Sequence, residues 1–365
     1  MKTKVFRMLW LAKILIKHAE VFYLISLISI VFGLTHSPLF LVFISCLVLL
    51  GKYFGNSFGL KLANNYMFAF QSTKIIVFIL FFVFVINQWI TIFPLLVFSF
   101  VIATLDGLFI HNINTLQSFI PKREDMLESN GFHSYLDPLT LLSSWFIGTV
   151  LLLRGNIENV LFVAIILSMI SLIIFYTIPS QNSVILLRKN QICKSKNIHI
   201  INIIEIMVKT SWAAVILFLF MHNQVTWWGI LNSVFFTGIT FAYFLLMKFH
   251  STFLLFERKI RIVNTFCMSI ILFVMSFTTH HLWMVFCVLL GGVTSQIGET
   301  IHTSRLIKKG ILRQNEFLLT CAMVISLLTF GLIINVLGIG SLYVITSILT
   351  IVLSIYYLLE KGHHP

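Results

Sequence analysis

The chain has 365 residues, of which 59% are hydrophobic and only 10% are charged, and its mean hydropathy is +1.00. Ordinary soluble domains carry about 25% charged residues, so the composition excludes a soluble globule and a disordered chain. The formal net charge of +13 would suit nucleic-acid binding only if the basic residues formed one surface, but they are spread between apolar segments. The sequence therefore predicts a polytopic membrane protein of the all-α class.

A membrane-spanning helix needs about 20 mostly apolar residues. Twelve segments meet this requirement, and each is bounded by polar residues, glycine or proline. In chain order they are 14–34, 37–60, 72–91, 93–118, 137–154, 157–178, 203–222, 225–247, 262–279, 281–304, 316–337 and 339–359. Because their number is even, both termini are expected on the same side of the membrane.

The basic residues test this count, because cytoplasmic loops of membrane proteins carry the excess of Lys and Arg. With the N-terminus in the cytoplasm, only Arg154 of the 25 Lys and Arg residues falls on the outer side, and Lys74 falls at the inner junction of the second and third spans. A missing span would move half of the loops across the membrane. We therefore expect both termini in the cytoplasm and a location in the cell membrane. A composition rich in Phe, Ile, Asn and Lys suggests a bacterial source.

The polar segment 181–202 divides the chain into two parts, 1–180 and 203–365, with six predicted spans each. A weak internal similarity supports a repeat, since Asn130 follows the fourth span and Asn315 follows the tenth, 185 positions later. Two repeats of six spans with a binding site at their interface are a known transporter architecture. We expect two pseudo-symmetric six-helix bundles joined by a cytoplasmic loop at 181–202.

Polar residues recur every three or four positions along the fourth and tenth spans, which places them on one face of each helix. These residues are Thr104, Gly107, His111, Asn114 and Ser118 in the fourth span, and Gly292, Ser295, Glu299 and His302 in the tenth, with an offset of 188 positions. Within a membrane such a face must contact another helix or a water-filled cavity. Packing through small residues explains the glycine and serine positions equally well. For the more polar residues we favour a water-filled path over helix packing. These residues are His111 and Asn114 in the fourth span, and Glu299 and His302 in the tenth.

Two buried acids in the first part of the chain have both a structural and a functional interpretation. A charged group at the centre of a span costs roughly 2.5–3.5 kcal/mol on insertion scales. Glu20 shares a helix face with Lys13 and Lys17, so either Lys17 neutralises it, or it faces a cavity and binds a proton or a cationic group of the substrate. Asp106 has apolar neighbours on its own helix, which makes it either a proton carrier or an uncharged carboxyl.

Other acids are assigned by their position along the chain. Glu299 precedes His302 by one turn, and the two form either a second proton-coupling site or, together with Arg305, an intrahelical ion pair. Asp137 stands directly before Pro138, which is typical of a residue that caps the start of a helix.

Several segments share a pattern with one transporter family. They are Phe6–Lys13, His18–Tyr23, Phe32–Pro38, Gly55–Gly59 with Leu62 and Ala63, Gln117–Pro121 with Ser129 and Asn130, and Arg305–Ile307 with Asn315. Together they resemble the major facilitator transporters, in the branch of macrolide-efflux-like drug exporters. The resemblance implies a secondary active transporter that exports a small organic or amphipathic compound by alternating access, driven by proton entry.

The chain also departs from that family. Asn64 and Asn65 stand where the family has Asp-Arg, so an inner-gate loop of Gly55, Gly59, Asn64 and Asn65 would use neutral hydrogen bonds. The Gly-Pro signature of antiporters is absent around Ser144–Gly148. These losses leave open a transport-inactive interaction or assembly protein, and a flippase of lipids or lipid-linked sugars is a third alternative.

Motifs for enzymatic chemistry are absent from the sequence. There is no H-E-x-x-H, no phosphate-binding glycine-rich loop, and no C-x-x-C pair among the five cysteines. We therefore expect no enzyme activity, no metal and no cofactor, and active transport must draw on an ion gradient. The expected partners are a small-molecule substrate, protons and the lipid bilayer, with no nucleic acid, and the protein is expected to be a monomer.

Overall fold

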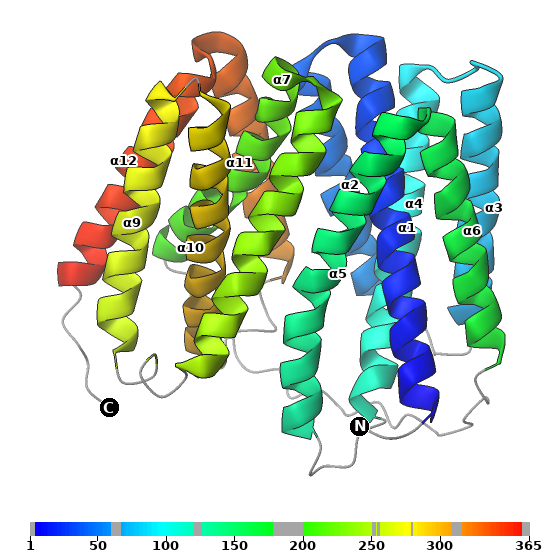
Figure 1. Ribbon diagram of the computed structural model, residues 1–365, viewed down its shortest axis with the longest axis horizontal. Coiled ribbons are helices and arrows are strands. Elements are labelled where there is room, and N and C mark those ends of the chain that lie inside the picture. Colours follow the sequence, from blue (N-terminus) through cyan, green and yellow to red (C-terminus); the bar gives the residue numbers. More distant parts are fainter. Residues whose placement is uncertain are drawn as a thin grey trace. The chain divides into compact units, whose positions relative to one another are not determined.

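The computed structural model describes residues 4–59, 67–119, 126–177, 200–249, 253, 256–278, 280–308 and 316–359. These residues contain eleven helices and no strand (Figure 1). The helices are α1 Lys4–Thr35, α2 Pro38–Gly59, α3 Met67–Ile86, α4 Ile92–Phe119, α5 Met126–Arg154, α6 Ile157–Tyr176, α7 Ile200–Lys248, α9 Glu257–Phe277, α10 His281–Lys308, α11 Glu316–Leu337 and α12 Ile339–Leu359. Each contains a stretch that is long and apolar enough to cross a membrane, so the predicted all-α membrane class is confirmed.

Two differences from the predicted spans concern α7 and α5. The spans predicted at 203–222 and 225–247 both fall within α7, a helix of 49 residues, so the count of twelve crossings stays a prediction. Helix α5 begins at Met126 and contains Pro138 in its interior. The prediction that Asp137 caps this helix is therefore wrong, because the helix begins well before Asp137.

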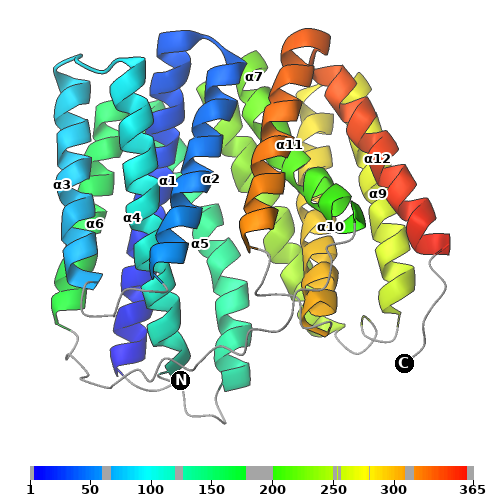
Figure 2. The same ribbon diagram turned by 180° about the vertical axis from the view of Figure 1, so that it is seen from behind.

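Contacts divide the chain into two compact units, Met1–Gln191 and Ile192–Pro365. In the first unit, α1 packs against α4, α5 and α6, and α2 packs along α4 (Figures 1 and 2). In the second unit, α7 packs against α10, α11 and α12, and α9 packs along α12. Because α1 lies among so many neighbours, 72% of its most apolar window is buried, and polar side chains on α1 must find partners inside the first unit.

Some connections between neighbouring helices are very short. Helix α1 ends at Thr35 and α2 begins at Pro38, while only Gly338 separates α11 from α12. Gly338 has a φ of +82°, a left-handed conformation that glycine adopts without steric cost. Such tight connections require consecutive helices to run antiparallel.

Each unit also contains a crossing at which two glycines bring helix backbones together. A Cβ added to Gly55 of α2 would lie 2.9 Å from the Cα of Gly107 in α4. In the second unit, a Cβ added to Gly238 of α7 would lie 3.2 Å from the Cα of Gly292 in α10. Small residues permit this close approach of helices in a membrane, so both crossings depend on the absence of side chains.

The two crossings have spacings close to that of the weak internal similarity in the sequence. Gly107 and Gly292 are 185 positions apart, like Asn130 and Asn315, and Gly55 and Gly238 are 183 positions apart. The polar residues of the fourth and tenth spans align with each other at an offset of 188. This offset differs from 185 by three residues, which is almost one helical turn. With the spacing of 185, Asn114 of the fourth span corresponds to Glu299 of the tenth.

We predict that Gly55→Ala destabilises the protein, because the new methyl group would collide with the backbone of α4. Overpacking of this kind costs typically about 1–3 kcal/mol. The matched control is Gly33→Ala in α1, where an added Cβ meets no atom within 4 Å, and its stability should stay equal or rise slightly because alanine favours helix. Thermal unfolding of both variants in detergent checks this, and equal unfolding temperatures for the two would contradict it.

Candidate functional site

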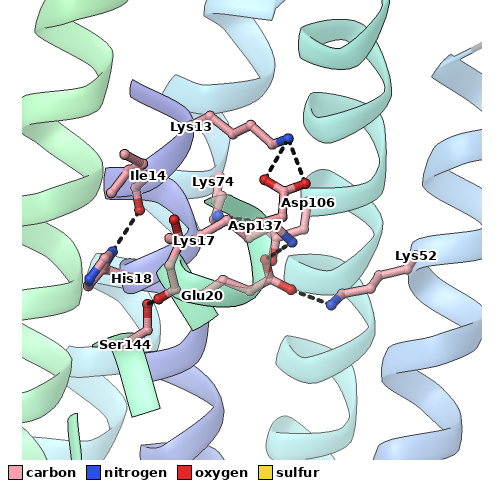
Figure 3. A network of polar contacts seen from close by, with 11 residues as sticks. Lys13, Ile14, Lys17, His18, Glu20, Lys52, Lys74, Asp106, Asp137 and Ser144 are labelled. Carbon is pink, nitrogen blue, oxygen red and sulfur yellow. Dashed lines mark hydrogen bonds and ion pairs between the residues drawn. The ribbon is translucent and has the colours of Figure 1, made fainter. Parts of the chain in front are cut away.

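Charged side chains meet in the first unit near the middle of its helices. We call this group the midspan cluster, and it consists of Lys17 and Glu20 of α1, Lys52 of α2, Lys74 of α3 and Asp106 of α4 (Figure 3). Glu20 lies close to the centre of the candidate span Arg7–Thr35, and Asp106 lies near the centre of α4. At this depth lipid cannot satisfy a charge, so each member needs a partner from the protein.

Two lysines hold Glu20, one at each carboxylate oxygen. Lys17 Nζ donates a hydrogen bond to Glu20 Oε2 over 2.9 Å, and the Lys52 ammonium donates to Oε1. The Glu20 side chain is only 6% exposed, whereas those of Lys17 and Lys52 are 24% and 33% exposed. The structure thus contains the Glu20–Lys17 pair that the sequence offered as one alternative, and it adds Lys52 as a second partner.

The pair of Lys74 and Asp106 is the most deeply buried part of the cluster. Their side chains are 0% and 2% exposed, and the Lys74 ammonium donates to Asp106 Oδ1. Lys74 Nζ also lies 5.2 Å from the ring centroid of Phe78, a distance at which a cation and an aromatic ring attract each other. Lys74 lies about two turns inside α3, deeper than the inner junction near which the sequence analysis placed it. The neighbours of Asp106 on its own helix are apolar, as the sequence indicates, and its charged partner comes from another helix.

The ion pairs of the cluster lie close to one another. Lys17 and Lys52 share the Glu20 carboxylate, and Lys52 is attracted by Asp106 as well. Tyr23, one turn after Glu20, stacks on Phe78 with a centroid distance of 5.2 Å, and Lys74 lies over the same ring. The buried Tyr23 hydroxyl has no hydrogen-bond partner in the described part of the chain. The three ion pairs are therefore neighbours within one cluster.

A further set of polar contacts joins α1 to α5 beside the cluster. Lys13 Nζ lies 3.0 Å from Asp137 Oδ1, and Asp137 is 48% exposed. His18 Nδ1 lies 2.9 Å from the Ile14 carbonyl oxygen, and its Nε2 lies 3.2 Å from Ser143 Oγ. The position of Asp137 inside α5 thus serves an interhelical ion pair.

The structure leaves part of the predicted polar stripes undescribed. His111 and Asn114 belong to α4 and His302 to α10, but their side chains lie outside the described part of the structure. Glu299 lies in α10 of the second unit and is exposed. Their assignment to a cavity or to proton coupling stays a prediction.

The predicted inner-gate residues are only partly described. Gly55 and Gly59 are buried and belong to α2, which ends at Gly59. Asn64 and Asn65 lie outside the described residues. Both glycines lie within the span predicted at 37–60, and Gly55 contributes to the crossing with α4. Their role in an inner gate stays a prediction.

Sequence reasoning missed Lys52 and Lys74 as members of the site. A usable signal was present, because both lysines lie within predicted apolar spans where an unpaired charge is expensive. Each of them therefore predicts an acidic partner on another span, and only the packing of the helices identifies which acid it is. The described residues contain no group of three or more His, Cys, Asp or Glu that could hold a metal ion.

Comparisons with known proteins find similar structures but no matching sequence family or curated relative. No family model and no curated protein matches the chain. Among solved structures, it is similar to a bacterial homologue of the iron transporter ferroportin in an inward-facing state, with 12% identity, a TM-score of 0.71 and coverage of 98% of this chain and 99% of the other. It is also similar to the xylose transporter XylE from E. coli in a partially occluded inward-open conformation, with 11% identity, a TM-score of 0.72 and coverage of 99% and 98%.

A third similar structure is a bacterial metal transporter, with 13% identity, a TM-score of 0.70 and coverage of 98% of both chains. These similarities extend over nearly the whole length of each protein, while the identities are low. They show that this chain has the same fold as these solved transporters.

We predict that Lys74→Met strongly destabilises the protein, because it leaves Asp106 without its direct partner in a buried site. Breaking a buried ion pair in this way costs about 3–5 kcal/mol, whereas replacing both members by apolar residues is often neutral or stabilising. The double variant Lys74→Met/Asp106→Leu should therefore recover most of the loss. Thermal unfolding in detergent measures both effects, and a double variant no more stable than the single one would refute this explanation.

Proposed function

We propose that the protein is a secondary active transporter that exports a small organic compound in exchange for protons. The observation that carries the proposal is the midspan cluster, in which Glu20 lies at the centre of α1 between two partly exposed lysines. Ionisable residues inside membrane spans are expensive and mark substrate paths and proton relays. A fold shared with transporters supports this interpretation, and export is the direction implied by the resemblance to drug exporters.

In this proposal Glu20 is the group that binds the coupling proton. The Glu20–Lys52 pair links α1 to α2, so protonation of Glu20 removes the charge that joins the two helices. A ligand shifts a conformational equilibrium only by binding one state more tightly than the other. The proton meets this condition, because it binds the state in which the ion pairs are open.

The proposal includes the alternating-access architecture that the sequence predicts. It has twelve crossings in two six-helix bundles, with both termini in the cytoplasm of a bacterial cell. The length of α7 supports the count, because its 49 residues are more than twice the roughly 20 residues that one crossing needs. Two crossings require the chain to reverse direction between the segments predicted at 203–222 and 225–247. We propose that α7 provides the seventh and eighth crossings.

A transport-inactive assembly protein is the main alternative, and the loss of family motifs motivates it. Helix packing alone does not require three carboxylates and four lysines inside one unit, because apolar residues of similar size pack at least as well. The accessible lysines of the cluster therefore favour transport over a purely structural role.

We predict that Glu20→Gln abolishes proton exchange. Purified protein is placed in liposomes that contain a trapped pH indicator, and an imposed pH gradient is followed after addition of ethidium as an amphipathic cation or p-toluenesulfonate as an organic anion. At least one compound should dissipate the gradient with the wild-type protein, but not with Glu20→Gln, because glutamine binds no proton.

The matched control for this experiment is Glu158→Gln, the same chemical change at an exposed position in the first turn of α6. This variant should exchange protons at the wild-type rate. Exchange at the wild-type rate by Glu20→Gln would overturn the coupling role of Glu20. Failure of both compounds to dissipate the gradient would count against the transporter itself.

A further inference from the structure

We propose that the midspan cluster is the binding site of an organic anion, whose negative charge is bound by Lys17 and Lys52. The inference rests on the proposed transport function and specifies the chemical class of the substrate. It differs from the expectation drawn from the sequence, in which Glu20 would bind a cationic group.

The first observation is an imbalance of charge. The ion pairs described in the first unit contain four lysines and three carboxylates: Lys13, Lys17, Lys52 and Lys74 with Glu20, Asp106 and Asp137. Two of these pairs, Lys13–Asp137 and Lys74–Asp106, are balanced. The surplus positive charge therefore belongs to Lys17 and Lys52, which share the single carboxylate of Glu20.

The second observation is the direction from which the cluster is accessible. Its carboxylates are almost completely buried, since Glu20 is 6% exposed and Asp106 is 2% exposed. The side chains that remain partly exposed are the lysines Lys17 and Lys52. A solute that reaches the cluster thus meets ammonium groups first, and both oxygens of Glu20 are already occupied. This arrangement favours an anion and disfavours a cation.

The surplus charge is not explained by lysines that extend to the membrane surface. Lysines near the end of a span often place their ammonium group at the interface. Here both ammonium groups turn toward Glu20, which lies near the centre of α1 (Figure 3). Among the described ion pairs, the surplus positive charge therefore lies at the cluster itself.

Within this site Glu20 is a positioning residue. Its two oxygens hold the ammonium groups of α1 and α2 on either side of one carboxylate, which keeps both of them available to the same ligand. Protonation of Glu20 would release this arrangement of the two ammonium groups. An inside-negative membrane potential drives an anion outward, which agrees with export.

The test measures equilibrium binding to the purified full-length protein in detergent, without any gradient. The probe is p-toluenesulfonate, a permanent organic anion, and the comparison ligands are the neutral p-toluenesulfonamide and the cation benzyltrimethylammonium. We expect saturable binding of the sulfonate and none of the other two. Benzoate and phenyl phosphate then distinguish a carboxylate from a phosphate as the preferred anionic group.

Variants of the lysines assign the binding to the cluster. Lys17→Met and Lys52→Met should each weaken sulfonate binding about tenfold or more, as expected for loss of a hydrogen bond to a charged group. Each variant keeps one lysine on Glu20, so the carboxylate is not left unpaired. Lys52→Arg should restore binding, and Lys259→Met, an exposed lysine of α9, should bind like the wild type.

The outcomes separate this inference from the proposed function. Wild-type affinity in both Lys17→Met and Lys52→Met, binding of the cation in place of the anion, or absence of saturable binding of all three anions would overturn the anion site. Proton exchange driven by ethidium in liposomes would then still support a transporter. Lysine-dependent binding of the sulfonate without proton exchange would support the anion site and contradict proton-coupled transport.

Discussion

The cost of placing a charge in the membrane interior determines how the first unit is built. Each of its paired carboxylates has a lysine partner, and the most buried acid, Asp106, has the most buried lysine, Lys74. Since lipid offers no hydrogen bonds, these pairs must form within the protein. They join α1 to α2, α3 to α4, and α1 to α5. The charges thus determine which helices must stay together for the unit to be stable.

The geometry of the midspan cluster depends on the glycine crossing. Lys52 precedes Gly55 by three positions in α2, and Asp106 directly precedes Gly107 in α4. The close approach of the two glycine backbones therefore sets the separation of two members of the cluster. Any substitution that pushes α2 away from α4 would also move Lys52 relative to Asp106, which couples packing in this unit to the geometry of the site.

The sequence predicts those features that depend on one helix at a time. Apolar length located the helices, and the spacing of Lys17 and Glu20 gave their pairing, because residues three apart share a helical face. The pair of Lys74 and Asp106 could not be derived in this way, since it requires knowing that α3 lies beside α4. Asp137 was misassigned for a related reason: Pro138 is a typical start signal, but α5 continues through it.

The glycine crossing of the second unit shows whether packing at such a crossing needs charged neighbours. A Cβ added to Gly107 would meet the carbonyl oxygen of Lys52, and one added to Gly292 would meet that of Phe235, so Lys52 and Phe235 occupy equivalent places. Directly before the crossing glycine, the second unit has Gly291 where the first has Asp106. The same crossing therefore forms without these two charges. Helix packing at this crossing therefore does not account for the two charges of the first unit.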